Sequence, residues 1–477
     1  MFKSLTRREF LRGVAAASAA GVLGACAPKI VEVEKVVKET VVVKETIIVE
    51  GEEKVVEKVV EVEKLVTPTA VPATALKGEV VTVWKDNDGW SSPVGLAKVK
   101  MFNELYPGIE LVGIGAGGDY PFVQKVTTMI AGGTPPDLMA HTAGRISALG
   151  GKYVFERLEP RVEASSVLPR VKEHMPQWGE GIFMGKLVGL AQDQNISLWF
   201  YNKDLFDQAG VDYPSIDWTW DDMVEIGLKV TDADNNQFLF EPGTHSYQDA
   251  SMWFWQAGGT LFSENGWHTD LDKEPNILSM EFLVDLFVKH KVVPAKGAQL
   301  GEIGVSFDTG KLAMTSNSTG ALAQQLGDKA TWDFDWSAVF APTGPGGGDG
   351  FAKCNVFSIG QGAKNADLAW VLMEWWFTDE TQTAFAEMGE VVARNDIFKA
   401  VGLPNLPAHL HPALERSFEK GRALEREPGW SLCQKYWKDE LDPAYLGQIT
   451  AREAMMNAFA KAQPELEIYM EELGAPR

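Results

Sequence analysis

The feature that most constrains the fold is a regular alternation of strand and helix patterns in residues 79–140. Glu79 to Trp84 is Val-rich and alternates as a strand does, and Leu96 to Tyr106 repeats apolar residues at helical spacing. Pro107-Gly108 then turns the chain into a second strand, Ile109 to Ile114. This order predicts an α/β fold with a parallel, doubly wound sheet and right-handed crossovers.

The segment from Asp119 to His141 supplies the next helix and the third strand. Pro121 suits a first helical turn, where its missing N–H is harmless, and Gly132-Gly133 ends the apolar repeat. Asp137 to Ala140 is then predicted to be a short buried strand. Because ligands in open α/β sheets gather beyond the carboxyl ends of the strands, the polar residues that follow this strand are candidates for a binding site.

Composition bounds the class of protein. The 477 residues carry a formal net charge of −22, with 45% hydrophobic and 23% charged residues, as in a globular protein of roughly two or three domains. So acidic a chain is repelled by phosphate backbones, and nucleic acid is not an expected partner. Three cysteines are too few for a disulfide scaffold. Cys354 and Cys433 could pair in an oxidising compartment or stay apart as small core residues.

The N-terminus has the layout of an export signal. Arg7-Arg8 precedes a run of small apolar residues that is too short to span a membrane. The paired arginines resemble a twin-arginine signal, and Leu23 to Cys26 resembles the lipobox of bacterial lipoproteins. These resemblances imply that residues 1–26 are a signal peptide. They also imply that Cys26 is lipidated and anchors an extracytoplasmic protein to the outer face of the cytoplasmic membrane.

Residues 27–77 form a low-complexity linker of Val, Glu and Lys that ends in a Pro- and Thr-rich stretch. Val55, Val59, Val62 and Val66 have the spacing of a coiled-coil seam, although so many β-branched residues also permit extended structure. We predict a charged spacer that lifts the folded domain off the membrane, with a self-associating stalk as the alternative.

A glycine-rich loop, Gly113 to Gly118, raises the question of nucleotide binding. A dinucleotide fingerprint follows the first strand of its unit, whereas this loop follows the second, and the chain has no Gly-Lys-Ser/Thr. We therefore predict a flexible loop at the mouth of a cleft and no cofactor.

Seven segments occur in an order similar to that of a known family. They are FNELYPGIEL, QKVTTMIAGGTPPDL, GKLVGL, YNKDLFDQAGVDYP, WTWDDM, FDTGKLAM and NADLAWVLMEWWFTDE. Together with the lipobox, they make the chain resemble the family 1 extracellular solute-binding proteins of ABC importers, the maltose-binding-protein type, over nearly all of residues 79–400. The resemblance implies a two-lobed clamshell, the type II periplasmic-binding-protein fold, with one ligand bound between the lobes.

The resemblance also implies how the chain is divided. The N-terminal lobe would hold residues 78–192 and 356–400, and the C-terminal lobe would hold residues 196–352 and 401–477 with its C-terminal helices. Hinge crossovers would join them. The implied partners are a small ligand, most simply a carbohydrate, and the transmembrane subunits of an ABC permease.

The 16 tryptophans fit such a ligand. Sugars present flat patches of C–H and rims of hydroxyls, which aromatic faces, amides and carboxylates bind. Some tryptophans lie in helical patterns and are expected in the core, namely Trp218, Trp220, Trp370, Trp375 and Trp376. The candidate ligand-binding residues lie in loops, at strand ends or at the hinge: Trp84, Asp86, Asn87, Trp90, Tyr120, His141, Arg145, Asp193, Asn195, Trp255, Trp267, Asn317 and Arg394.

One departure from the family pattern bears on the ligand. The family has an aromatic residue after TGxxAM, whereas this chain has Ser316 to Gly320, SNSTG, after an expected strand from Leu312 to Thr315. This difference argues against a stacked sugar at that spot and favours a smaller or more polar ligand.

The alternative class is a secreted glycoside hydrolase, because carboxylates are plentiful and such an enzyme needs two of them across a cleft. The sequence contains no Gly-x-Ser-x-Gly, His-Glu-x-x-His or Cys-x-x-Cys motif. We therefore predict a binding protein rather than an enzyme, without a metal site. A binder of a polyamine, an amino acid or a metal ion remains an open alternative.

Overall fold

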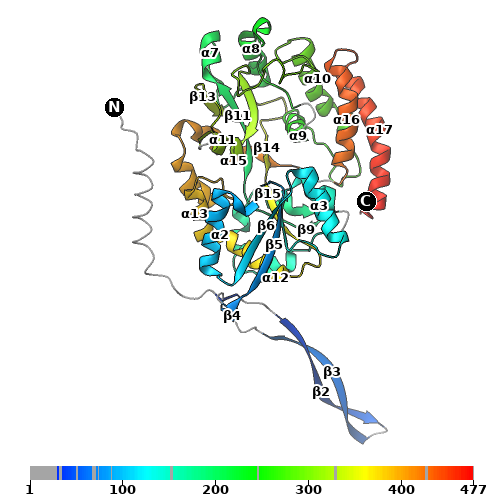
Figure 1. Ribbon diagram of the computed structural model, residues 1–477. Helices are drawn as coiled ribbons and strands as arrows, with labels where there is room; N and C mark the ends of the chain where they lie inside the picture. The colour runs from blue at the N-terminus through cyan, green and yellow to red at the C-terminus, as the bar shows by residue number, and fades with distance from the viewer. Residues whose placement is uncertain are drawn as a thin grey trace, which may run out of the picture. The chain divides into compact units, whose positions relative to one another are not determined.

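The computed structural model describes residues 30–31, 35–49, 52–66, 71–72, 75–87, 89–150, 154–243, 247–326, 330–424 and 428–475 (Figure 1). The predicted signal peptide and Cys26 lie outside these residues. The larger of two compact units comprises residues 80–97 and 111–477, and the smaller one includes the linker and residues 98–110.

The linker forms a long antiparallel hairpin. Strand β2 (Lys35–Val49) pairs with β3 (Glu52–Val66), and the register sets Lys38 opposite Glu63. The valines of the supposed coiled-coil seam all lie on β3, so the coiled-coil alternative is wrong for these residues. Valine is stiff at its branched Cβ, which suits an extended chain.

The first sheet has five strands in the order β10-β15-β7-β5-β6. They are β5 (Gly78–Trp84), β6 (Ile109–Gly115), β7 (Leu138–Thr142), β10 (Leu190–Ala191) and β15 (Asn355–Ile359). Strands β5 and β7 are parallel, as predicted, but β15 runs antiparallel to β7 and β10 antiparallel to β15. The sheet is therefore mixed, because β15 returns from a distant part of the chain and is not bound by the crossover rule for consecutive strands.

The predicted helix and strand around Asp119–His141 are confirmed. Helix α3 (Asp119–Ala131) ends at Gly132, and Gly133 has φ +74°, a conformation that glycine adopts without a steric penalty. Helices α3 and α4 (Gly144–Gly150) contact β7, and α12 (Ala366–Trp376) contacts β15. The predicted core tryptophans of α12 are buried.

The second sheet has the order β12-β11-β14-β16, and β13 also pairs with β11. Its strands are β11 (Asn195–Asn202), β12 (Met314–Ser318), β13 (Trp336–Val339), β14 (Gly350–Lys353) and β16 (Gly421–Ala423). Strand β12 lies further along the chain than predicted, because its antiparallel pairing with β11 extends from Met314 to Ser318. Asn317 therefore lies within the strand rather than after it.

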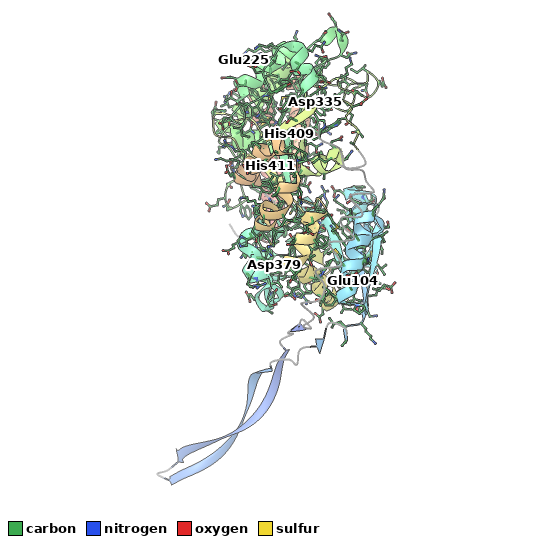
Figure 2. The ribbon with its side chains drawn as sticks, turned by 90° about the vertical axis from the view of Figure 1, so that its left-hand side faces the viewer. Glu104, Glu225, Asp335, Asp379, His409 and His411 are labelled. Carbon is green, nitrogen blue, oxygen red and sulfur yellow. The ribbon has the colours of Figure 1, made fainter. Side chains whose placement is uncertain are left out.

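Helices and tryptophans build the core around the second sheet. Trp218 and Trp220 are buried there, as predicted, with Trp199 and Trp253. Helix α8 (Trp220–Val230) begins at a capping box in which Thr219 and Asp222 satisfy each other's backbone N–H. Figure 1 shows α16 and α17, in red, beside α10. Figure 2 labels Glu225 of α8 and Asp379 of α13 at opposite ends of the folded part in that view.

The remaining helices and strands, the longest of which are α10, α16 and α17, vary in length. They are β1 (Ile30–Val31), β4 (Val71–Pro72), α2 (Pro93–Leu105), α5 (Glu159–Ala164), α6 (Leu168–Val171), β8 (Ile182–Phe183), β9 (Lys186–Leu187), α7 (Lys203–Ala209), α9 (Tyr247–Gln256), α10 (Glu274–Val288), α11 (Thr319–Leu326), α13 (Asp379–Glu387), α14 (Asn395–Ile397), α15 (His411–Lys420), α16 (Trp430–Tyr445) and α17 (Ala451–Glu472).

The chain passes between the two sheets more than once. It leaves β10 for β11 through residues 192–194 and returns from β14 to β15 through Cys354. Cys354 and Cys433 are both buried, and no disulfide joins them. Within the described residues, no helix is long and apolar enough to cross a membrane.

Candidate functional site

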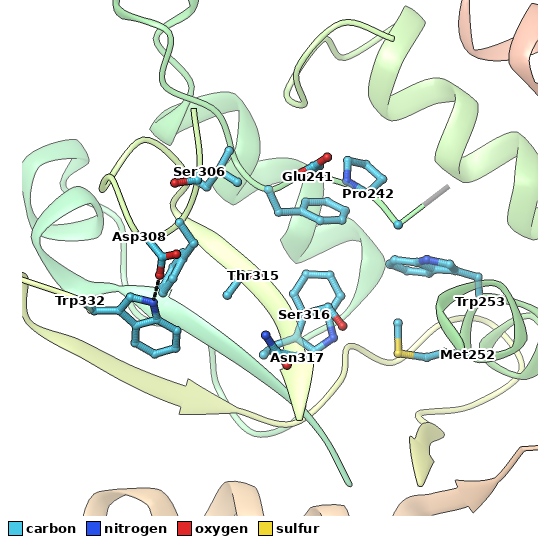
Figure 3. A pocket seen from close by; sticks show the side chains of 15 residues that line it. Glu241, Pro242, Met252, Trp253, Ser306, Asp308, Thr315, Ser316, Asn317 and Trp332 are labelled. Atoms are coloured by element: carbon cyan, nitrogen blue, oxygen red, sulfur yellow. Dashed lines mark hydrogen bonds between the residues drawn. The ribbon is translucent and has the colours of Figure 1, made fainter. Parts of the chain in front are cut away.

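A cavity of about 350 Å³ lies beside β12 of the second sheet (Figure 3). Its aromatic lining comes from separate elements: Trp199 on β11, Trp253 on α9, and Phe240, Phe307 and Trp332 in loops. Its polar lining consists of carboxylates, an amide and hydroxyls, contributed by Glu241, Ser306, Asp308, Thr315, Ser316 and Asn317. The cavity thus combines apolar faces with hydrogen-bonding groups.

Asp308 is held in position by its neighbours. Its Oδ1 accepts hydrogen bonds from the Trp332 indole N–H at 2.6 Å and from the Thr331 hydroxyl at 3.1 Å, the first of which is drawn in Figure 3. A carboxylate can accept several hydrogen bonds, so Asp308 keeps acceptor capacity for a ligand while its orientation is set.

Two buried polar atoms of the cavity wall have no hydrogen-bond partner among the described residues. They are Nε1 of Trp199 and Oγ of Ser316. A buried donor left unpaired costs about 1–3 kcal/mol. Both atoms are buried, so a ligand in the cavity would reach them only if the wall moved.

The aromatic groups support one another. Trp199 meets Phe240 and Trp253 edge to face, with ring centroids 5.1 and 6.1 Å apart. Trp332 meets Phe307 in the same way at 4.8 Å. Such contacts restrict the rings. Trp199, Phe240 and Trp253 are at most 2% exposed, so half-buried Trp332 presents the largest free face of these rings to the cavity.

A second cavity, of about 510 Å³, differs in chemistry. Its lining includes Phe155, Phe183, Met184 and Val188, with Arg157 on one side, and it contains no carboxylate. Its polar lining consists of Arg157, Lys186 and the amide of Gln361, whereas the cavity beside β12 offers carboxylates, an amide and hydroxyls. The cavity beside β12 is therefore the better candidate for a sugar.

The predicted residues after β5 lie close together and contact the glycine-rich loop. Half-buried Trp84 meets Trp90 edge to face at 4.8 Å, and Trp90 is 5% exposed. Asp86 is exposed and pairs with Lys85 at 2.8 Å. Asn87 packs so closely against the loop that a Cβ at Gly115 would lie 2.3 Å from its carbonyl oxygen. The loop therefore needs its glycine there for close packing.

His141, a predicted ligand contact, is fully buried. Its ring lies between Phe122 and Phe155, with centroids 5.2 and 5.7 Å away, and its nitrogens are within hydrogen-bond distance of Thr142 O and Ser358 Oγ. Burial lowers the pKa of His141 to about 4, so the ring is neutral at pH 7. In this structure the side chain faces core residues rather than an open surface.

The other predicted residues of the first sheet and its helices have mixed surroundings. Tyr120 is 71% exposed at the start of α3. Arg145 is half-buried, with Nε 3.7 Å from Asp119 Oδ1. Arg394 is 5% exposed and is clamped by ion pairs to Asp379 and Asp396. Of these three, only Tyr120 presents a large open surface.

The predicted residues of the hinge and the second sheet are also dispersed. Asp193 bonds to Asn355, and Asn195 Oδ1 accepts from Ser318 Oγ at 3.3 Å. Trp255 is 2% exposed beneath the Arg422 guanidinium, 4.7 Å from the ring centroid, and Trp267 packs partly buried against the second core. Asn317 is the predicted residue that lines the cavity beside β12.

Sequence reasoning missed several residues of that cavity. Trp253 lies in a helix, and only the tertiary fold turns it toward the cavity. Asp308 and Trp332 lie far apart in sequence and meet through a hydrogen bond. A sequence signal existed for Asp308, which belongs to the FDTGKLAM segment that runs into β12.

Comparisons with known proteins bear on the family and the fold. The family model described as bacterial extracellular solute-binding protein matches residues 85–383. The ABC substrate-binding protein of Listeria monocytogenes, solved in complex with cycloalternan, superposes with a TM-score of 0.70 at 21% identity, covering 83% of this chain and 99% of that one. The chain therefore has the two-lobed α/β clamshell fold of these binding proteins.

Two curated relatives match shorter stretches of the chain. The arabinooligosaccharide-binding protein of Halalkalibacterium halodurans is 36% identical over 108 residues, which cover 23% of this chain and 24% of that protein. A periplasmic-binding protein of an amino-acid ABC transporter from Sinorhizobium fredii is 25% identical over 236 residues, 47% of this chain and 52% of that protein. The chain thus matches only about a quarter and about half of the length of these relatives. The match of the family model, which spans more than half of the chain, is the decisive one: the chain belongs to the bacterial extracellular solute-binding proteins.

Proposed function

We propose that the protein captures a sugar or oligosaccharide outside the cytoplasm and delivers it to the permease of an ABC importer. The observation that carries this proposal is the cavity beside β12, where tryptophan and phenylalanine rings stand next to carboxylates, an amide and hydroxyls. Rings suit the C–H faces of a sugar, and Asp308 and Asn317 suit its hydroxyls.

The ligand would be enclosed by closure of the two lobes. We assign residues 78–192 and 356–400 to one lobe and residues 196–352 and 401–477 to the other. In the open form the ligand binds the cavity beside β12, and closure adds contacts from exposed residues of the other lobe, such as Tyr120, Asp86 and Asn87. Ligand then shifts an equilibrium between open and closed forms by its greater affinity for the closed one.

The N-terminal segment would hold the protein at the outer face of the cytoplasmic membrane. We propose that residues 1–26 direct export through a twin-arginine signal, that Cys26 carries the lipid anchor, and that the β2–β3 hairpin spaces the binding domain from the membrane. A permease in the same membrane would then meet its loaded partner at high local concentration.

The ligand class has a second candidate. The relative from Halalkalibacterium halodurans is named for an arabinooligosaccharide and the Listeria monocytogenes structure holds cycloalternan, which supports a carbohydrate. The relative from Sinorhizobium fredii is named for an amino acid, which keeps that class as the alternative. The polar stretch Ser316–Gly320 beside the cavity supports a small or polar sugar over a long stacked one.

The test is a binding panel on the protein without its signal peptide. Oligosaccharides, amino acids, polyamines and metal ions are added singly, and calorimetry and melting temperature report binding, while chromatography checks the sugars for new reducing ends. We expect an oligosaccharide to bind with a dissociation constant of micromolar order, about −8 kcal/mol, and to be recovered intact. Binding by amino acids alone would reject the sugar, and new reducing ends would favour a glycoside hydrolase.

A further inference from the structure

Backbone and side-chain hydrogen bonds line both sides of the passage from β10 to β11. On one side Gln192 N–H donates to Asn355 O at 2.9 Å. On the other side Gln194 N–H donates to Val391 O at 3.2 Å, and its side-chain amide donates to Val392 O at 2.7 Å. The passage is therefore fastened both to the start of β15 and to residues 391–392.

Asp193 stands between these two sides and grips Asn355 with both carboxylate oxygens. The Asn355 backbone N–H donates to Oδ1 at 2.7 Å, and its side-chain Nδ2 donates to Oδ2 at 2.6 Å. Hydrogen bonds to an ionised carboxylate are short and about twice as strong as neutral ones. Asn355 directly follows Cys354, the residue of the return passage. Strand pairing flanks this contact on both sides, Ala191 with Val356 and Asn195 with Lys353, and between them the pair ties the outgoing passage to the returning one.

We propose that Asp193 and Asn355 are positioning residues for closure, and that Asp193 does not contact the ligand as first predicted. Hinges are a few residues at element ends that absorb the change in φ and ψ. If two passages could drift independently, closure would have to order them at a cost in affinity. The clamp keeps their separation constant, so the lobes turn as two bodies about one axis. This inference rests on the proposed function, because closure matters only where a ligand binds between the lobes.

The chain contains a matched pair that does not join two passages. Asp137 accepts from the Asn365 backbone N–H at 2.8 Å on Oδ1 and from Asn365 Nδ2 at 3.3 Å on Oδ2. Asp137 precedes β7 and Asn365 precedes α12, and both elements belong to the first sheet and its helices. The paired groups are the same, although Asp137 Oδ2 also accepts from the Val81 N–H at 2.9 Å.

The experiment compares Asn355→Ala with Asn365→Ala. Each change removes one side-chain hydrogen bond to a carboxylate and keeps the backbone one, and both asparagines are partly buried. Spin labels are placed at two exposed positions, Gln124 on α3 and Glu225 on α8. Figure 2 labels Glu225. The distribution of distances between the labels is then measured without ligand, and affinity is measured for the tightest oligosaccharide of the panel.

We expect Asn355→Ala to broaden the distance distribution and to weaken binding by about five- to tenfold, because closure must now order the passages. Asn365→Ala should lower the melting temperature to a similar extent and leave both the distribution and the affinity near those of the unaltered protein. Asp193→Ala, which removes both bonds, should broaden the distribution further than Asn355→Ala does.

The inference is overturned if Asn355→Ala leaves the distance distribution unchanged, or if Asn365→Ala broadens it equally. Its failure is distinguishable from failure of the proposed function. Should no sugar bind, the distances without ligand still decide whether the clamp holds the passages. Should sugar bind while all distributions coincide, the clamp is refuted and the sugar-binding function stands.

Discussion

The strand ends of the first sheet and the cavity beside β12 have similar residues but use them differently. After the first-sheet strands, Asp86 pairs with Lys85 and Arg145 lies near Asp119. His141, predicted to follow the third strand, lies within β7 and is buried between aromatic rings. Beside β12, by contrast, Asp308 and Asn317 line a cavity, and the Asp308 carboxylate keeps acceptor capacity beyond its bonds to Trp332 and Thr331. The difference shows that a place after a strand does not by itself identify a ligand-binding residue. A polar side chain there can already be hydrogen-bonded or ion-paired within the protein.

The largest expected effect concerns His141 and the pH dependence of stability. Its pKa is lowered to about 4 in the folded protein, whereas an unfolded chain has about 6.5, so the unfolded state binds a proton first as pH falls. The stability that the neutral ring contributes is complete above pH 6.5 and is lost between about 6.5 and 4, by about 3 kcal/mol in all. Urea unfolding at pH values from 7 to 4 measures the free energy of unfolding. This free energy should fall less steeply with pH in His141→Gln than in the unaltered protein. Equal slopes would mean that the ring is accessible to protons and could still face a ligand.

The next effect tests the aromatic side of the cavity. Trp332→Ala removes a flat surface and frees the Asp308 carboxylate from its 2.6 Å hydrogen bond. We expect affinity for the panel's tightest oligosaccharide to fall by about 30- to 100-fold, the size typical of a central aromatic contact. Trp178→Ala is the control, because Trp178 is also half-buried but lies against Lys172, away from the cavity lining. Equal losses in both variants would indicate general damage to the fold.

A smaller effect is expected from the charge of Asp308. Asp308→Asn keeps an oxygen for the Trp332 indole and removes the negative charge, so a sugar hydroxyl loses a charge-assisted acceptor. Calorimetry should show roughly tenfold weaker binding. Asp367→Asn alters another exposed carboxylate, which pairs with Arg161 outside the cavity. It should bind as the unaltered protein does, and a matching loss there would refute a local role for Asp308.

The smallest effect would come from the first lobe. Tyr120 is 71% exposed, and if closure brings it to the ligand it acts at the rim of the site. Tyr120→Ala should weaken binding by about two- to fivefold, since rim contacts contribute little. Tyr213→Ala, an exposed tyrosine bonded to Asp207, is the matched control. If Tyr120→Ala is indistinguishable from the control, the first lobe contributes no aromatic contact and the contrast between the two regions becomes sharper.

Much of the fold could be predicted because it depends on local signals. The helix at Asp119–Ala131 follows from an apolar repeat bounded by proline and glycine, and the strand at Leu138–Thr142 follows from a short apolar run. The antiparallel β15 could not be predicted, because its direction depends on where a distant segment re-enters the sheet. The shift of β12 toward Asn317 has the same cause, since pairing with β11 decides the register.

The candidate site was less predictable than the fold. The sequence by itself determined the residue types, the alternation of strands and helices, and the resemblance to solute-binding proteins, because periodicity and turn residues act over a few positions. Tertiary structure alone decided which polar groups remain available. Both carboxylate oxygens of Asp193 accept hydrogen bonds from Asn355. Asp308, by contrast, is oriented by Trp332 and still lines a cavity. The physical reason is that a hydrogen-bonding partner is chosen by proximity in space, and long-range packing sets that proximity.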